Sequence, residues 1–116
     1  MTTTHIPHTL DKIFAALANE HRRDIIYQLS LQPHSIHQLA IQRDLSLPAI
    51  HKHITILEEA NLILRKKIGR THFLALNRTA LKGLQDWLMN YNTYWGNDAE
   101  TLENYAEYLE RGKEGR

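Results

Sequence analysis

The chain has no cysteine among its 116 residues. Without a thiol it can form no disulfide, thiolate zinc site, iron–sulfur cluster or cysteine nucleophile. It has only three prolines and five glycines, and no apolar run is long enough to cross a membrane. Because the N-terminus also lacks a basic segment followed by an apolar run, we expect a cytoplasmic protein without a signal peptide. At 42% hydrophobic and 23% charged residues, a single globular domain is expected over 1–116, with residues 1–8 as a flexible tail.

The balanced total charge, 14 basic against 13 acidic side chains, conceals an asymmetry along the chain. Residues 43–82 contain eight bases and three acids, which gives +5, whereas residues 83–110 contain six acids and no base, which gives −6. A basic block inside a folded domain indicates a polyanionic partner such as nucleic acid. The alternative is an ordinary solvated face with mixed charges.

Apolar residues at helical spacing predict four helices before residue 61. The first two cover about 9–19 and 21–31. Ser35, with a glutamine three residues later, fits a capping box that opens the third helix. Ser46 is an N-cap candidate for the fourth helix, and Asn61 suits the left-handed position that follows it.

The spacing of apolar residues changes after the fourth helix. Residues 62–68 and 71–76 are rich in Ile, Leu, Phe and Thr and flank a glycine turn, which predicts a β-hairpin. Residues 78–110 return to helical spacing, with a coiled-coil-like seam over about four heptads. Gly96 and Asn97 interrupt this pattern, so whether the terminal helix is continuous stays open. The fold class expected is mainly α with a small β-hairpin, as in a winged helix-turn-helix.

The third and fourth helices, joined by a tight turn, form a helix-turn-helix arrangement, whose second helix lies in the major groove of DNA. Counting 100° per residue from the expected core face gives its outward residues. The candidate DNA contacts on this helix are Ser46, Pro48, Ala49, His51, Lys52 and Thr55. The hairpin adds Arg65, Lys66, Lys67 and Arg70, which could hold the phosphate backbone. The helix pair alone could be an ordinary corner between helices, but the basic hairpin directly after it favours DNA binding.

Four segments resemble those of ArsR-type winged helix-turn-helix transcriptional regulators. They are Phe14–Arg23, Leu45–Ile54, Leu57–Ile63 and Gly69–Phe73. The resemblance implies a DNA-binding repressor that acts as a homodimer. Such a dimer would place two recognition helices about one turn of double-stranded DNA apart, on an inverted-repeat operator. Phosphate-binding glycine motifs and a G-x-S-x-G motif are absent from the sequence, so we do not expect an enzyme.

The resemblance also implies pairing through the terminal helix, often together with the first helix. The candidate dimer-interface residues are Leu10, Phe14, Leu84, Trp87, Leu88, Tyr91, Trp95, Leu102, Tyr105 and Leu109. The apolar seam fits such pairing, although the aromatic residues could instead pack on their own domain.

Two departures from the family pattern concern metal sensing. The third helix has no Cys-x-Cys, and the terminal helix has no histidine. His34 and His37 could share one face, and two subunits could then offer four nitrogens to zinc. We favour the simpler interpretation that both residues belong to a polar start of the third helix. We therefore assign no metal, cofactor or catalytic residue. A protein-interaction module and a histidine-based metal-responsive repressor stay as alternatives, and the inducing signal is open.

Overall fold

The computed structural model describes residues 8–91 and 96–114. The chain divides into two compact units, Met1–Gln85 and Asp86–Arg116. Within the described residues, no helix combines the length and the apolar character needed to span a bilayer.

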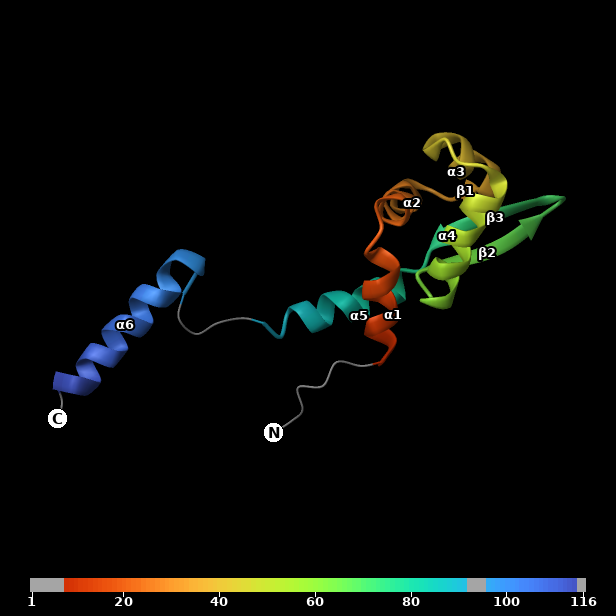
Figure 1. Ribbon diagram of the computed structural model, residues 1–116. Helices are drawn as coiled ribbons and strands as arrows, with labels where there is room; N and C mark the ends of the chain where they lie inside the picture. The colour runs from red at the N-terminus through yellow and green to blue at the C-terminus, as the bar shows by residue number, and fades with distance from the viewer. Residues whose placement is uncertain (1–7, 92–95, 115–116) are drawn as a thin grey trace. The chain divides into compact units, whose positions relative to one another are not determined.

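Four helices form most of the first unit (Figure 1). They are α1 (His8–Leu17), α2 (Glu20–Leu31), α3 (Ile36–Arg43) and α4 (Leu47–Glu59). The predicted capping box is confirmed, because the backbone N–H of Gln38 donates to Ser35 Oγ (3.1 Å) and that of Ser35 donates to Gln38 Oε1 (2.8 Å). Ser46 caps α4 by accepting from the backbone N–H of Ala49 (3.3 Å). The tight turn between these helices contains Asp44 in the left-handed conformation (φ 54°).

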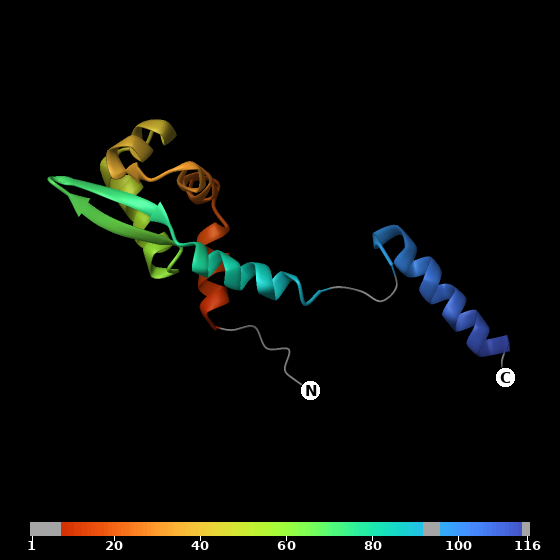
Figure 2. The same ribbon diagram turned by 180° about the vertical axis from the view of Figure 1, so that it is seen from behind.

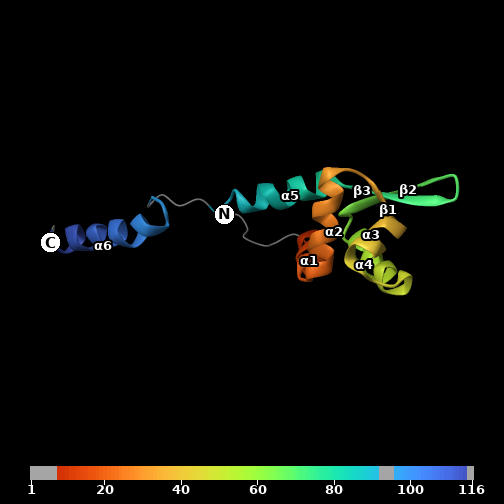
Figure 3. The same ribbon diagram turned by 90° about the horizontal axis from the view of Figure 1, so that it is seen from above.

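A three-stranded antiparallel sheet completes the first unit, in the order β1-β3-β2. Its strands are β1 (His34–Ser35), β2 (Ile63–Ile68) and β3 (Thr71–Leu76). The hairpin of β2 and β3 is confirmed, with Asn61 at φ 59° after α4 and Gly69 at φ 65° in the tip. Figures 2 and 3 show this hairpin projecting beyond the helices as a wing beside α4. The short β1 was not expected from the sequence.

The core of the first unit lies between the helices and the inner face of the sheet. Its fully buried large side chains are Ile25, Leu39, Ile50, Ile54, Leu57, Leu62 and Leu74. Ile50, Ile54 and Leu57 form the inner face of α4, at the i, i+4, i+7 spacing of an amphipathic helix. Burial of this face leaves the opposite side of α4 exposed to solvent.

The sequence leaves open whether the helical segment 78–110 is continuous, and the structure has two helices there, α5 (Arg78–Leu88) and α6 (Asp98–Glu114). Gly96 and Asn97 determine where the second of these helices begins. Gly96 has a φ of 101°, which L residues rarely adopt. Asn97 then caps α6 reciprocally with Glu100, whose backbone N–H donates to Asn97 Oδ1 (2.9 Å) while that of Asn97 donates to Glu100 Oε1 (3.2 Å). A helix that begins at Asp98 cannot continue the preceding one.

Candidate nucleic-acid interface

The exposed side of α4 carries the candidate contacts that the sequence predicted. Pro48, His51, Lys52 and Thr55 are exposed, and Ala49 is half-buried. These four exposed residues, together with Ile56, line a shallow hollow in the surface. This side therefore offers a cation, an imidazole and a hydroxyl, the groups that contact phosphates and base edges.

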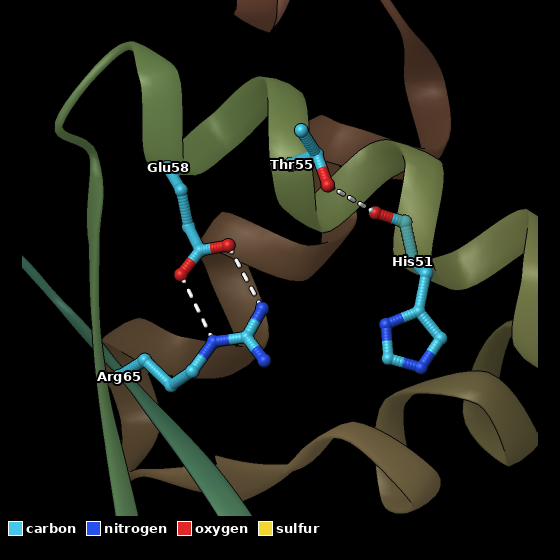
Figure 4. Close-up of polar contacts among 4 residues, drawn as sticks. All are labelled: His51, Thr55, Glu58 and Arg65. Carbon is cyan, nitrogen blue, oxygen red and sulfur yellow. Dashed lines mark hydrogen bonds and ion pairs between the residues drawn. The ribbon is translucent and has the colours of Figure 1, made fainter.

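The hydroxyl groups of this surface already form hydrogen bonds with the backbone of α4, and Figure 4 shows the one made by Thr55. The Thr55 hydroxyl donates to the backbone carbonyl of His51 (2.9 Å), one turn earlier. Its proton is used within the helix, so toward a ligand this hydroxyl is an acceptor. The exposed Ser46 hydroxyl oxygen accepts the N-cap bond, which leaves its own proton available for donation.

The four basic side chains of the wing lie in different surroundings. Lys66, Lys67 and Arg70 are all exposed. Arg65, in contrast, forms a bidentate ion pair with Glu58 at the end of α4, with Nε 3.0 Å from Oε2 and Nη2 2.8 Å from Oε1 (Figure 4). The part taken by Glu58 could not be predicted from the sequence, because glutamates are common on helix surfaces.

Beneath α4, a polar cluster connects the helices of the motif. The guanidinium of Arg22 on α2 lies 3.1 Å from Nδ1 of His53 on α4 and donates to the carbonyl of Ala16 (2.6 Å) at the end of α1. On the same side, Arg43 Nε donates to His21 Nδ1 (3.0 Å), and its Nη1 is 3.3 Å from Asp24.

His53 is the residue whose titration this cluster controls. Burial lowers its pKa, and the nearby Arg22 and His21 lower it further. His53 is half-buried, and its ring is hydrogen-bonded to Arg22. Arg22 and His21 were not predicted, since nothing local in the sequence brings α2 against α4.

The two histidines considered for zinc do not lie in equivalent places. His34 is buried in β1, with Nδ1 2.8 Å from the carbonyl of Gln32, and His37 is exposed on α3. Among the residues that the structure describes, no group of three or more His, Asp or Glu side chains could hold a metal ion.

The candidate residues of the dimer interface lie in both units. Leu10 is buried in the core of the first unit, at 5% exposure, so little of its side chain is left for a partner, whereas Phe14 is 37% exposed. Leu84 and Trp87 are half-buried, and the ring of Trp87 contacts that of Tyr91 edge-on at 4.9 Å. The exposed members are Leu88, Tyr91, Leu102, Tyr105 and Leu109. Trp95 lies outside the described residues.

Tyr108 is an exposed aromatic residue of α6 that the sequence pattern did not single out. Its ring lies 6.0 Å from that of Tyr105. The heptad count could have included it as a residue flanking the seam.

Comparison with known proteins agrees with this geometry. The model of the bacterial regulatory proteins of the arsR family matches residues 19–64, which span α2 to the start of β2. A solved ArsR family transcriptional regulator is 33% identical, with a TM-score of 0.69 over 76% of this chain and 91% of that one. The chain belongs to the ArsR family.

Two proteins of Bacillus subtilis are also similar to this ArsR-family chain. The transcriptional repressor SdpR is 27% identical over 89 residues, which cover 77% of this chain and 99% of SdpR. The uncharacterized HTH-type transcriptional regulator YuzN is 36% identical over 86 residues, 67% of this chain and 94% of YuzN. This ArsR-family chain is therefore a DNA-binding transcriptional regulator with a winged helix-turn-helix fold, and not an enzyme.

Proposed function

We propose that this ArsR-family regulator is a repressor that binds an inverted-repeat operator as a homodimer. The observation that carries the proposal is the exposed side of α4, with its capped N-terminus next to a basic wing. In a helix-turn-helix protein, the N-terminal residues of the second helix lie nearest the base edges.

We assign the reading of bases to Ser46, Pro48, Ala49, His51, Lys52 and Thr55. Lys52 can contact a phosphate or a guanine edge, and the hydroxyls and imidazole supply directional hydrogen bonds. Lys66, Lys67 and Arg70 on the wing then hold the adjacent backbone.

The proposed dimer rests on the apolar residues of α5 and α6. Leu102, Tyr105 and Leu109 follow a spacing of three and four residues and are between 44% and 77% exposed. Such a stripe on an otherwise acidic helix is typical of helix–helix pairing. A two-fold dimer would place two copies of α4 about one duplex turn, roughly 34 Å, apart on an inverted repeat.

Selection of bound duplexes from a random pool tests the proposal directly. We expect recovery of an inverted repeat, and retention of the protein on that duplex at about 100 mM salt with release at high salt. If no duplex is enriched and no retention occurs, the protein-interaction alternative takes its place. Stoichiometric zinc in gently purified protein, with DNA affinity changed by a chelator, would instead support the metal-responsive alternative.

The wing cations can be tested individually by substitution. Lys66→Ala or Arg70→Ala should weaken binding to the selected and to unrelated duplexes alike, because phosphate contacts carry no sequence information. Each should also make the slope of log affinity against log salt shallower by about 0.9. Titrations between about 50 and 200 mM salt measure this slope. Unchanged affinity and slope in both variants would contradict the assignment of the wing.

A further inference from the structure

Arg65 differs from the other basic residues of the wing because its charge is already matched. Its Nε and Nη2 donate to the two carboxylate oxygens of Glu58, at 3.0 and 2.8 Å, and only about a third of either side chain is exposed (30% and 33%). A bidentate arginine–carboxylate pair fixes the mutual orientation of its two groups as well as their separation.

The pair joins the two elements that must meet DNA together. Glu58 lies in the last turn of α4, and Arg65 is the third residue of β2. Side chains alternate between the faces of a strand, so Arg65 shares a face with Ile63 and Lys67, while Lys66 lies on the other face. Ile63 is buried at 4% exposure, and Arg65 reaches α4, so this face of the wing is turned toward the helices.

The neighbouring surface of α4 places the pair close to the proposed DNA contacts. His51 and Glu58 are seven residues apart and therefore lie on the same side of α4. Figure 4 shows the His51 ring and the Arg65 guanidinium on that side of the helix. A change in the angle of the wing would consequently alter its position relative to the base-reading residues of α4.

We propose that Glu58 and Arg65 are positioning residues that set the angle between the wing and α4, while Lys66, Lys67 and Arg70 contact the phosphates. This inference rests on the proposed function and separates the four wing cations that the sequence had treated alike. A guanidinium neutralised by a carboxylate releases few counterions from DNA, so it adds little to the salt-dependent part of binding. A fixed angle instead lets the helix and the wing bind one duplex simultaneously.

Glu58→Gln is the decisive substitution, because the two possible roles of Arg65 predict opposite changes in the affinity for DNA. If Arg65 positions the wing, Glu58→Gln and Arg65→Ala should each weaken binding to the selected duplex by about tenfold. Arg65→Ala should leave the salt slope unchanged, because on this view Arg65 makes no phosphate contact. If Arg65 contacts a phosphate, loss of Glu58 would release it toward DNA, and Glu58→Gln would tighten binding and steepen the slope.

A charge exchange supplies the rescue. In the double variant Glu58→Arg/Arg65→Glu, the pair can reform with its ends reversed, and affinity should return to within about threefold of the original protein. A direct phosphate contact predicts the reverse, since a glutamate on the wing would repel the backbone and the double variant would bind worse than Arg65→Ala.

Matched controls separate positioning from folding and from the proposed function itself. A partly exposed ion pair at the surface contributes little to stability, so the melting temperatures of Glu58→Gln and Arg65→Ala should stay close to the original. Affinity for a scrambled duplex should change by less than about twofold, because loose electrostatic contacts do not need a fixed angle.

Lys66→Ala and Lys67→Ala should make the slope shallower, which Arg65→Ala should not. A shallower slope for Arg65→Ala, or tighter binding by Glu58→Gln, overturns the positioning role. If the original protein binds no duplex at all, it is the proposed function that fails.

Discussion

At the scale of the residue, His53 shows how the packing of α2 against α4 controls a titration. Its Nδ1 lies 3.1 Å from the guanidinium of Arg22, so the neutral ring serves as the acceptor. Burial, Arg22 and His21 all lower the pKa of His53 below its ordinary value of 6.5. A protonated ring would lose the bond and add a positive charge beside the arginine.

This shift predicts how stability depends on pH. Well above pH 6.5 the ring is neutral in both the folded and the unfolded chain, so its contribution is complete there. As the pH falls below 6.5 toward the lower pKa of the folded protein, the unfolded chain binds more protons, and the free energy of unfolding decreases.

His53→Asn keeps an acceptor near Nδ1 but does not titrate. Urea unfolding at about pH 7.5 and 5.5 should show a smaller loss for His53→Asn than for the original protein.

An equal loss in both proteins would mean that His53 does not contribute to acid sensitivity. His37 is exposed on α3, so His37→Asn is a matched control and should lose as much stability as the original protein.

At the scale of the element, the features predicted from sequence are those that depend on neighbouring residues. Ser35, Ser46 and Asn61 mark helix ends through bonds or angles within a few positions, and all three act as expected. The two residues of β1 are too few to show a strand period. The pairing of Glu58 with Arg65 depends on how β2 returns along α4, and in the sequence Arg65 is indistinguishable from Lys66 and Lys67.

The break between α5 and α6 was only partly visible, although its signals are local. Gly96 and Asn97 interrupt the pattern, and Glu100 completes a capping box. Apolar spacing of three and four residues nevertheless continues across them, since two separate helices can share that spacing.

This cap gives a prediction for α6. Asn97→Ala removes the side-chain acceptor, which should cost the helix about 1 kcal/mol. The amides of the first two turns of α6 should then exchange with solvent about fivefold faster. Asn97→Ser keeps an N-cap acceptor and should exchange at nearly the original rate. If all three proteins exchange alike, the cap does not determine where α6 begins.

At the scale of the whole molecule, the charge asymmetry and the exposed apolar stripe suggest different partners for different parts of the chain. The basic residues of 43–82 include those of α4 and the wing, and the acidic residues of 83–110 include those of α6. An acidic helix is repelled by a phosphate backbone, which leaves its apolar stripe for a second copy of the chain. On this view the neutral total reflects two surfaces of opposite sign.

Disruption of the stripe should therefore affect assembly first and DNA binding as a consequence. Leu102 is 77% exposed, so replacing it with glutamate should not unfold its own subunit. In a helix pair, Leu102→Glu would bury an unpaired charge, so we expect the variant to sediment as a monomer and the original protein as a dimer. Asn104→Glu adds the same charge about 200° around α6 and should leave the dimer intact.

Because a monomer contacts one half-site, Leu102→Glu should lose affinity for the full inverted repeat but retain its affinity for a single half-site. A dimeric Leu102→Glu variant would show that pairing does not involve this face of α6.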